Sequence, residues 1–308
     1  MTNDNKKSGT GGATRSYAPF GTTIEARAVA TGLYLVATPI GNLGDISLRA
    51  LETLAVADCI ACEDTRVTLK LIERYGIATP LLAYHEHNSE EALPKILARL
   101  AERQSVVLVS DAGTPLISDP GYRLVRAAIE AGHPVTAVPG ASAVLAALSL
   151  AALPTDRFYF EGFLPPKQSA RRKRITELSA IPATLVLFES GPRLAASLAD
   201  LAAGFGKRQA AICRELTKLH EEIRRNDLTQ LARDYAEGRE TRGEIVIVIS
   251  PPPEKKVADS DIDDLLRQAL LRVSLKDAVS EVALVTGRAR REVYQRALDM
   301  TNDSDDER

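Results

Sequence analysis

Short apolar runs alternate with amphipathic stretches along most of the chain from residue 33 onward. Runs with the length and composition of strands buried on both faces lie at 33–37, 59–62, 105–110 and 135–138. Apolar residues at helical spacing lie between and after them, at 48–55, 67–75, 90–102, 121–131 and 142–151. This alternation predicts a parallel sheet covered by helices, in an α/β domain that ends near Pro154.

A second set of elements follows this domain. Strands are expected at 158–160, 184–188, 209–213 and 245–249, with a helix over 193–203. Three prolines at 251–253 then interrupt the chain before a helical segment with capping boxes that begin at Ser260 and Ser274. The expected division is a disordered tail over 1–31, α/β domains over 32–154 and 155–250, a linker over 251–259, a helical module over 260–300 and an acidic tail over 301–308.

The last two predicted helices of the module are joined at Thr286 and Gly287. The final helix carries arginines at a spacing compatible with a helix-turn-helix that contacts nucleic acid, namely Arg288, Arg290, Arg291 and Arg296. A dimerisation or packing module with a solvated basic face fits the same pattern equally well.

Overall charge adds little to this picture, because 39 basic and 41 acidic residues nearly balance. A nucleic-acid partner must therefore be sought in local basic patches, of which the segment 167–174 is the strongest. Cys59 and Cys62 form a C-x-x-C inside an apolar run without a second ligand pair, so we expect buried strand cysteines and no metal site. No stretch has the roughly 18 apolar residues of a membrane span, and no apolar leader follows Lys6 and Lys7. We therefore expect a cytoplasmic protein with no membrane partner.

Three loops rich in glycine and proline follow predicted strands directly, at 38–44, 110–121 and 138–142. Open α/β sheets bind ligands at loops on the carboxyl ends of parallel strands, and glycine there lets the backbone approach a ligand closely. Neither G-x-G-x-x-G nor the P-loop motif occurs, which argues against a standard dinucleotide or triphosphate site. The pattern favours a ligand held chiefly by backbone atoms.

Two other strand ends carry packed polar groups. Glu63, Asp64 and Arg66 follow one strand, and the segment 84–88 contains His85 and His87. Such groups are typical of a catalytic site. The acidic pair also fits a helix N-terminus, and the histidines also fit a solvated loop.

Several motifs occur in a characteristic order. They are Leu-Tyr-Leu-Val-Ala-Thr-Pro-Ile-Gly-Asn-Leu-Gly-Asp from Leu33, Glu-Asp-Thr-Arg from Glu63, Ser-Asp-Ala-Gly-Thr-Pro from Ser110, Val-Pro-Gly from Val138, Phe-Glu-Gly-Phe-Leu-Pro from Phe160, Cys-Arg-Glu-Leu-Thr-Lys from Cys213 and Arg-Gly-Glu from Arg242. In this order the set resembles the ribosomal RNA small-subunit methyltransferase I family, a branch of the tetrapyrrole-methylase superfamily of class III S-adenosylmethionine enzymes. The resemblance covers about 33–249 and extends to the helical tail. Where many relatives have Ser-Pro-His-Arg, this chain has Ser190-Gly-Pro-Arg193.

The resemblance implies the class III fold, with S-adenosyl-L-methionine bound in the N-terminal α/β domain and the second domain closing the cleft. The contacts it implies are Pro39, Gly41, Asp111, Ala112, Gly113, Thr114, Ser118, Ser142, Ala143, Phe163, Glu215, Leu216, Gly243 and Glu244. It also implies methyl transfer to a cytidine 2′-hydroxyl in the decoding region of small-subunit (16S) ribosomal RNA, within the assembled 30S subunit, by a homodimer.

A ribose hydroxyl is a poor nucleophile at neutral pH, so a carboxylate or imidazole within hydrogen-bond reach would assist the transfer. The candidate bases are Asp64, which we place first, Asp111, Glu86 and His87. Arg66 either clamps a neighbouring phosphate or forms a salt bridge with an adjacent carboxylate.

Contacts with RNA are expected from aromatic and basic side chains. Tyr84, His85 and His87 are expected to stack on bases. Phosphate contacts are expected from Lys167, Arg171, Arg172, Lys173, Arg174, Arg288 and Arg291. Two rival functions fit part of the pattern: a methylase of the same superfamily that acts on a tetrapyrrole, and a non-catalytic protein whose helical tail reads DNA. A tetrapyrrole enzyme has no evident use for the basic segment, so we favour RNA.

Overall fold

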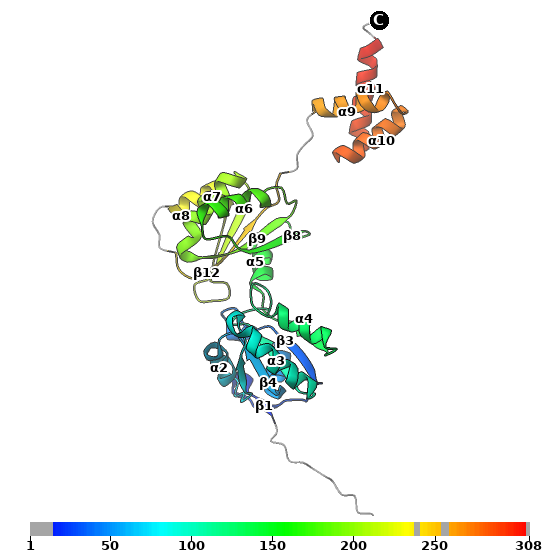
Figure 1. Ribbon diagram of the computed structural model, residues 1–308. Coiled ribbons are helices and arrows are strands. Elements are labelled where there is room, and N and C mark those ends of the chain that lie inside the picture. The colour runs from blue at the N-terminus through cyan, green and yellow to red at the C-terminus, as the bar shows by residue number, and fades with distance from the viewer. Residues whose placement is uncertain (1–14, 237–240, 254–258, 306–308) are drawn as a thin grey trace, which may run out of the picture. The chain divides into compact units, whose positions relative to one another are not determined.

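The structure is a computed structural model that describes residues 15–236, 241–253 and 259–305 (Figure 1). The chain forms two compact units, residues 1–252 and 253–308. The first unit holds two five-stranded sheets with their helices, and the second is helical throughout its described part. The predicted fold, two α/β sheets followed by a helical module, is confirmed.

The first sheet is parallel, with the strand order β5-β4-β6-β3-β7. Its strands are β3 (Gly32–Val36), β4 (Cys59–Cys62), β5 (Leu81–Ala83), β6 (Ser105–Val109) and β7 (Val135–Val138). The helices that follow them are α1 (Leu48–Val56), α2 (Thr65–Arg74), α3 (Ser89–Ala101) and α4 (Tyr122–Glu130), with short 3-10 turns η2 (Leu43–Asp45) and η3 (Glu86–Asn88). Successive side chains on each strand point to opposite faces, so the sheet has two cores. Val107 on one face packs with α1 and α2, and Leu108 on the other packs with α3 and α4.

The second sheet is mixed, with the order β11-β10-β12-β9-β8, and only β8 and β9 run parallel. Its strands are β8 (Phe158–Phe163), β9 (Thr184–Ser190), β10 (Gln209–Arg214), β11 (Glu222–Asp227) and β12 (Glu244–Ile249). The helices α6 (Gln168–Leu178), α7 (Gly191–Phe205) and α8 (Leu228–Ala236) cover one face (Figure 1). The sequence did not lead us to expect β11 or α8.

Helix α5 (Ala143–Ala151) covers the other face of this second sheet. Its buried residues Val144, Ala147 and Leu148 pack with Val186 of β9 and Val248 of β12. The sequence places this helix in the first domain, because it directly follows that domain's last strand. The assignment is wrong in terms of packing, and a boundary at residue 154 does not separate two independent cores.

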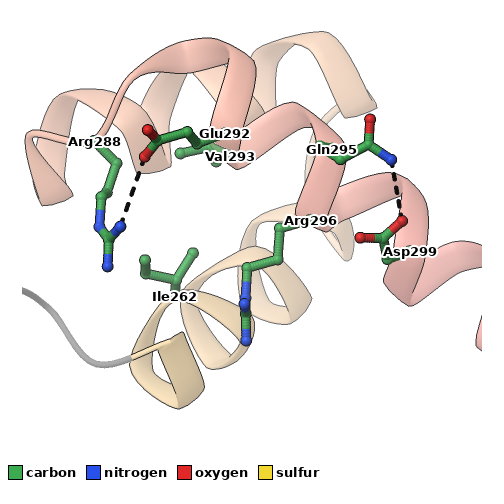
Figure 2. Close-up of a pocket in the computed structure, with 7 residues that line it drawn as sticks. All are labelled: Ile262, Arg288, Glu292, Val293, Gln295, Arg296 and Asp299. Atoms are coloured by element: carbon green, nitrogen blue, oxygen red, sulfur yellow. Dashed lines mark hydrogen bonds and ion pairs between the residues drawn. The ribbon is translucent and has the colours of Figure 1, made fainter.

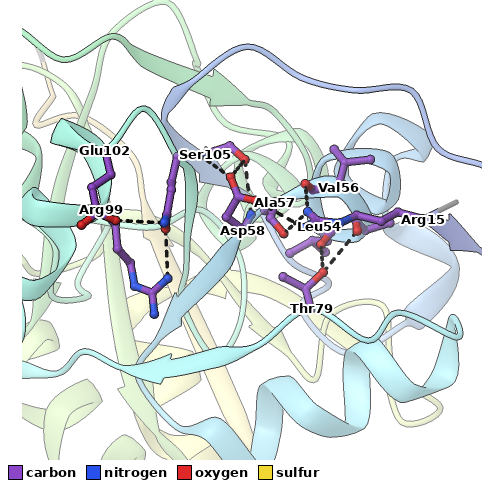
Figure 3. A network of polar contacts seen from close by, with 11 residues as sticks. Arg15, Leu54, Val56, Ala57, Asp58, Thr79, Arg99, Glu102 and Ser105 are labelled. Carbon is purple, nitrogen blue, oxygen red and sulfur yellow. Dashed lines mark hydrogen bonds and ion pairs between the residues drawn. The ribbon is translucent and has the colours of Figure 1, made fainter. Parts of the chain in front are cut away.

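Residues 15–31 are not the disordered segment that their composition led us to expect. They contain β1 (Ser16–Tyr17), η1 (Pro19–Gly21) and β2 (Ile24–Glu25), and the Tyr17 ring is buried in the core beside α1. The Arg15 guanidinium donates hydrogen bonds to the carbonyl oxygens of Val56 and Ala57 at the end of α1, and Asp58 joins it to Ser105 of β6 (Figure 3). This network satisfies backbone carbonyls that would otherwise end α1 without partners. Residues 1–14 of the predicted tail lie outside the described residues.

The second unit contains α9 (Asp259–Leu270), α10 (Leu275–Thr286) and α11 (Arg290–Asp305) around a small apolar core. Ser274 caps α10 as predicted, since its hydroxyl accepts a hydrogen bond from the Asp277 amide. Gly287 ends α10 in the left-handed conformation, which glycine adopts at no steric cost. By contrast, Ser260 lies inside α9 and not at its cap, and α11 extends into the segment expected as an acidic tail.

No helix in the described part of the chain is long and apolar enough to cross a membrane. The described residues also contain no cluster of three histidine, cysteine or acidic side chains that suits a metal ion. Cys59 and Cys62 are buried strand residues, and burial raises the pKa of both thiols.

Candidate functional site

The loops after β3 and β6 are joined directly at the carboxyl end of the first sheet. Thr38 and Gly113 exchange two backbone hydrogen bonds of 2.9 and 3.1 Å. The Thr38 hydroxyl also donates to the Ser110 carbonyl oxygen at 3.2 Å. Two of the three loops singled out in the sequence therefore form one continuous floor.

A pocket of about 360 Å³ opens over this floor. Its lining combines residues from both sheets of the first unit and their loops, because Glu244 begins β12 and Lys218 lies in the loop between β10 and β11 of the second sheet. The first-sheet side consists of Thr38, Pro39, Ile40, Gly41, Leu43, Val67, Thr68, Lys70, Leu71, Ser110, Asp111 and Ala112. The volume falls within the range of about 300–1,000 Å³ that is usual for small-molecule sites.

Five of the residues implied as cofactor contacts line this pocket: Pro39, Gly41, Asp111, Ala112 and Glu244. Others lie beside it in the same framework. The Glu215 carboxylate accepts a hydrogen bond from the Glu244 amide and lies against Gly243. Gly113 is hydrogen-bonded to Thr38 in the floor of the pocket.

The remaining implied contacts lie elsewhere in the first unit and do not line this pocket. The Thr114 hydroxyl donates to the Ala141 carbonyl oxygen, Ser142 caps α5, and Ala143 is the first residue of that helix. Leu216 is buried in the core around α5, Phe163 is exposed at the end of β8, and Ser118 faces Gly162 of that strand. These residues and the pocket do not form one cavity in this structure.

Asp64 forms the N-cap of α2 and is held by Arg66. Its carboxylate accepts one hydrogen bond from the Arg66 amide and two from the guanidinium, at 3.0 and 2.6 Å. These hydrogen bonds lower the pKa of Asp64 to about 2. A carboxylate with so low a pKa is a weak proton acceptor, so the geometry matches the salt-bridge interpretation of Arg66.

Two other carboxylates, Glu63 and Asp119, have raised pKa values, mainly because they are partly buried and also because the negative charge of Asp111 lies near both. Asp111 accepts a hydrogen bond from the Asp64 amide at 3.1 Å. Burial, followed by repulsion from Glu63, raises the pKa of Asp119 to about 6. A carboxyl group with this pKa changes charge near neutral pH, which is the behaviour expected of an acid–base residue.

The segment that follows β5 is only partly available to a ligand. Tyr84 is 2% exposed and packs in the core between the sheet and α3 and α4, so the prediction that it stacks on RNA bases is wrong for this structure. The ring centroids of His85 and His87 are 6.1 Å apart, and His87 and Glu86 are exposed on η3. His85 Nδ1 is buried and has no hydrogen-bond partner within the described residues.

The basic segment also divides into buried and exposed members. Arg171 is 5% exposed and forms a salt bridge of 2.6 Å with buried Asp200, so we withdraw it as a phosphate contact. Arg172 pairs with the same carboxylate at 2.7 Å, although its side chain remains largely exposed. Arg174 pairs with Glu161 and Glu177, which leaves it less suited to RNA than we expected. Lys167, the N-cap residue of α6, and Lys173, in the middle of that helix, are exposed.

The helical module has a hollow of its own of about 360 Å³ (Figure 2). It is lined by Ile262, Arg288, Glu292, Val293, Gln295, Arg296 and Asp299. Arg288 lies 3.6 Å from Glu292, and Arg296 forms two hydrogen bonds with Asp263. Arg291 is exposed on α11. The hollow is lined largely by charged groups that pair within the module, so it differs from the pocket of the first unit.

Comparisons with known proteins agree with this division of the chain. Residues 32–232 match the tetrapyrrole (corrin/porphyrin) methylases, and residues 256–301 match the RsmI C-terminal HTH domain. Ribosomal RNA small subunit methyltransferase I of Mesorhizobium japonicum is 52% identical over 284 residues, which cover 92% of this chain and 97% of the relative. The chain belongs to the ribosomal RNA small subunit methyltransferase I family. Proteins of this name from Erythrobacter litoralis and Escherichia coli O157:H7 are 50% and 44% identical over 89% and 87% of the chain, and over 97% and 94% of their own lengths.

Solved structures of other proteins share the fold of this methyltransferase I family member. Diphthine synthase superposes with a TM-score of 0.56 at 19% identity, over 77% of this chain and 94% of that one. A cobalt precorrin-4 methyltransferase superposes with a TM-score of 0.54 at 19% identity, over 71% and 94%. At such low identity the likeness concerns the fold alone, which is the class III methyltransferase fold.

Sequence reasoning missed several groups in this family member's pocket region. Lys218 is the last residue of the motif that begins at Cys213, but nothing in the sequence distinguishes a lysine that lines a pocket from one that is solvated. Asp119 stands before a proline at the end of the 110–121 loop, and its raised pKa depends on burial and on Glu63, which is remote in sequence. The Ser190–Arg193 turn has a structural role, because a side chain on Gly191 would meet the Thr241 carbonyl oxygen at 2.1 Å.

Proposed function

We propose that the protein transfers a methyl group from S-adenosyl-L-methionine to the 2′-hydroxyl of a cytidine in the decoding region of 16S ribosomal RNA. The observation that carries this proposal is the pocket between the two sheets, in a chain that matches relatives named ribosomal RNA small subunit methyltransferase I over nearly its whole length. Membership of the methylase superfamily favours the same cofactor.

The residues around the pocket fit that cofactor. Gly41 lines the pocket where the Lys218 side chain leaves no space for a Cβ atom, and the carboxylates of Asp111 and Glu244 line it together with two lysines. Carboxylates suit a ligand that carries a sulfonium and an ammonium group. When bound, the sulfonium supplies an already activated methyl group, so the protein mainly has to orient the acceptor and take up its proton.

For that proton we propose the carboxylate cluster of Glu63, Asp111 and Asp119, with Asp119 as the acceptor. Asp64 and Arg66 are better suited to positioning, because their salt bridge keeps the pKa of Asp64 near 2. The rate with wild-type protein should fall as the pH drops through about 6, where Asp119 becomes protonated.

The base assignment is tested by the pH profile of kcat/KM for wild type, Asp119→Asn and Asp64→Asn. Asp119→Asn should lower the rate about 10²-fold or more and abolish the acidic limb of the profile. If Asp64→Asn alone abolishes that limb, the acceptor is Asp64 and our assignment is wrong.

The RNA contacts that remain in this proposal are side chains that are exposed or partly exposed. His85 and His87 would stack on unpaired bases, with Glu86 beside them on η3. Lys167, Lys173, Arg172, Arg288 and Arg291 would contact phosphates. We further propose that the enzyme works in the cytoplasm, as a homodimer, on the assembled 30S subunit.

The direct test is transfer of labelled methyl from S-adenosylmethionine to 30S subunits from a strain that lacks this enzyme. Naked 16S RNA and a tetrapyrrole acceptor serve as alternative substrates. We expect label on one cytidine ribose with 30S subunits. Label on the tetrapyrrole alone would establish the small-molecule function, and sequence-specific DNA binding without any transfer would establish the non-catalytic one.

A further inference from the structure

At the pocket, the side chain of Lys218 extends from the second sheet's side to the loop that follows β3 of the first sheet. It belongs to the loop between β10 and β11, and its side chain lies directly against Gly41. A Cβ atom on Gly41 would stand 2.4 Å from Lys218 Cγ, 3.1 Å from Cδ and 2.8 Å from Cε. The hydrocarbon stem of Lys218 therefore forms part of the pocket wall, in contact with the loop after β3.

The ammonium group of Lys218 is held at the far end of this stem. It donates to Glu215 Oε1 at 2.9 Å and to Glu244 Oε2 at 2.7 Å. Glu215 Oε1 also accepts from the Glu244 backbone amide at 3.0 Å, so the three residues form one closed network. Burial lowers the pKa of Lys218, but the hydrogen bonds to the two carboxylates outweigh it and raise the pKa overall. Lys218 is thus charged at neutral pH and unsuited to accept a proton.

The backbone around this network is unusually constrained. Glu215 and Thr217 have positive φ values of 51° and 66°, a conformation that costs roughly 1–3 kcal/mol for each non-glycine residue. Gly243 has a φ of 97°, and a Cβ there would stand 2.4 Å from Glu215 Oε1. Thr217 Oγ1 is buried without a hydrogen-bond partner in the part of the chain that the structure describes. Strain of this kind persists where the surrounding structure holds a loop in a functional conformation.

We propose that Lys218 is a positioning residue for the cofactor: its stem sets the position of the Gly41 loop, and its ammonium group fixes Glu215 and Glu244 at the pocket. This inference rests on the proposed function, because it takes S-adenosylmethionine to be the ligand. It gives Gly41 a second reason to be glycine besides its φ of 147°, since any larger residue would displace Lys218.

A double-mutant cycle separates the stem from the charge. The variants are Gly41→Ala, Lys218→Ala and Lys218→Met, alone and combined, with dissociation constants for S-adenosylmethionine and S-adenosylhomocysteine measured by calorimetry. The backbone strain of Ala at position 41 is common to all backgrounds and cancels in the cycle.

Gly41→Ala should weaken binding about tenfold or more in the wild-type background. The loss should persist with Lys218→Met, which keeps Cγ, and largely disappear with Lys218→Ala, which removes it. Lys70→Met, at another lysine that lines the pocket, is the matched control and should show no coupling to Gly41→Ala. Equal losses in all three backgrounds would overturn the role of the stem.

The role of the charge is read from Lys218→Met alone. This variant lacks the ammonium group that holds the Glu215 and Glu244 carboxylates in place. The binding of both ligands should therefore weaken by a similar factor, although only S-adenosylmethionine carries the sulfonium charge. Unchanged affinity for S-adenosylhomocysteine would overturn the role of the ammonium group. If the wild-type protein binds neither ligand, the proposed function itself fails, and this result is distinct from binding without coupling.

Discussion

At the scale of single residues, the environment of each carboxylate decides its chemistry. Asp64 and Asp119 lie in the segments that follow the neighbouring strands β4 and β6, yet the pKa of Asp64 is lowered to about 2 and that of Asp119 is raised to about 6. Arg66 is two residues from Asp64, so their pairing was one of the alternatives visible in the sequence. The environment of Asp119 was not visible, because its burial and its proximity to Glu63 arise only when the sheet has formed.

Asp119→Asn should stabilise the fold at pH 8 and leave it unchanged near pH 3. Because the pKa of Asp119 is raised from 3.8 to about 6, the folded state binds this proton more tightly than the unfolded state does. The resulting stability is present below pH 3.8 and is lost as the pH rises through about 6. We expect a gain of about 1–2 kcal/mol at pH 8, since partial exposure reduces the effect.

Thermal unfolding of both proteins between pH 3 and pH 8 measures this gain. Asp45→Asn, at an exposed position in η2, is the control and should follow the wild-type curve. A difference between wild type and Asp119→Asn that is the same at every pH would contradict the raised pKa.

Arg171 illustrates what a charge pattern leaves open. Its partner Asp200 lies 29 positions further along the chain, on α7, so the basic segment reads from sequence as uniformly solvated. In the structure the helix turns Arg171 inward and leaves Lys173 outside.

Asp200→Ala should destabilise the first unit by about 3–5 kcal/mol, because it leaves the Arg171 guanidinium buried without its counter-charge. Urea denaturation of this variant measures the loss. Lys173→Ala, two positions along the same helix and exposed, should change stability by less than about 0.5 kcal/mol. Similar small effects of both substitutions would mean that Arg171 reaches solvent.

At the scale of elements, apolar runs predicted four of the five strands in each sheet and did not predict β5 or β11. The buried strands β3, β4, β6 and β7 are short apolar runs, and their positions agree with the prediction to within a residue or two. β11 was missed because it is an edge strand with the polar sequence Glu-Ile-Arg-Arg-Asn-Asp. α8 carries a readable signal in Leu228, Leu231 and Tyr235, which fall on one helical face and are all buried.

The packing of α5 is the element-level feature that sequence did not supply. Leu148→Ala should cost about 2–5 kcal/mol, because this side chain is buried against the second sheet. Leu145→Ala on the same helix is the matched control, since Leu145 is 56% exposed and should contribute little. Chemical denaturation of the two variants gives the comparison, and equal costs would mean that α5 does not pack as described.

At the scale of the whole molecule, the chain consists of two units with separate cores. The cobalt precorrin-4 methyltransferase matches 71% of this chain with 94% of its own length, so the α/β part exists elsewhere largely by itself. The motifs identified both parts correctly, but the function of the helical module depends on surfaces that no motif describes.

A chain that ends at Pro252 should keep its affinity for S-adenosylmethionine and lose affinity for RNA. The pocket lies wholly within the first unit, whereas Arg288 and Arg291 belong to the second. Calorimetry with the cofactor and filter binding with 30S subunits measure the two effects. An Arg288→Ala, Arg291→Ala variant of the full chain shows whether lost RNA affinity comes from these side chains. Unchanged RNA affinity of the shortened chain would assign the module to another task, such as dimerisation.

The position of α5 also bears on how the protein is made. The helix leaves the ribosome before any strand of the sheet that it covers, and β12, one of its main contacts, ends only at Ile249. During synthesis the apolar face of α5 therefore lacks its partners in the second sheet until about 100 further residues have been added, although all strands of the first sheet have already been made.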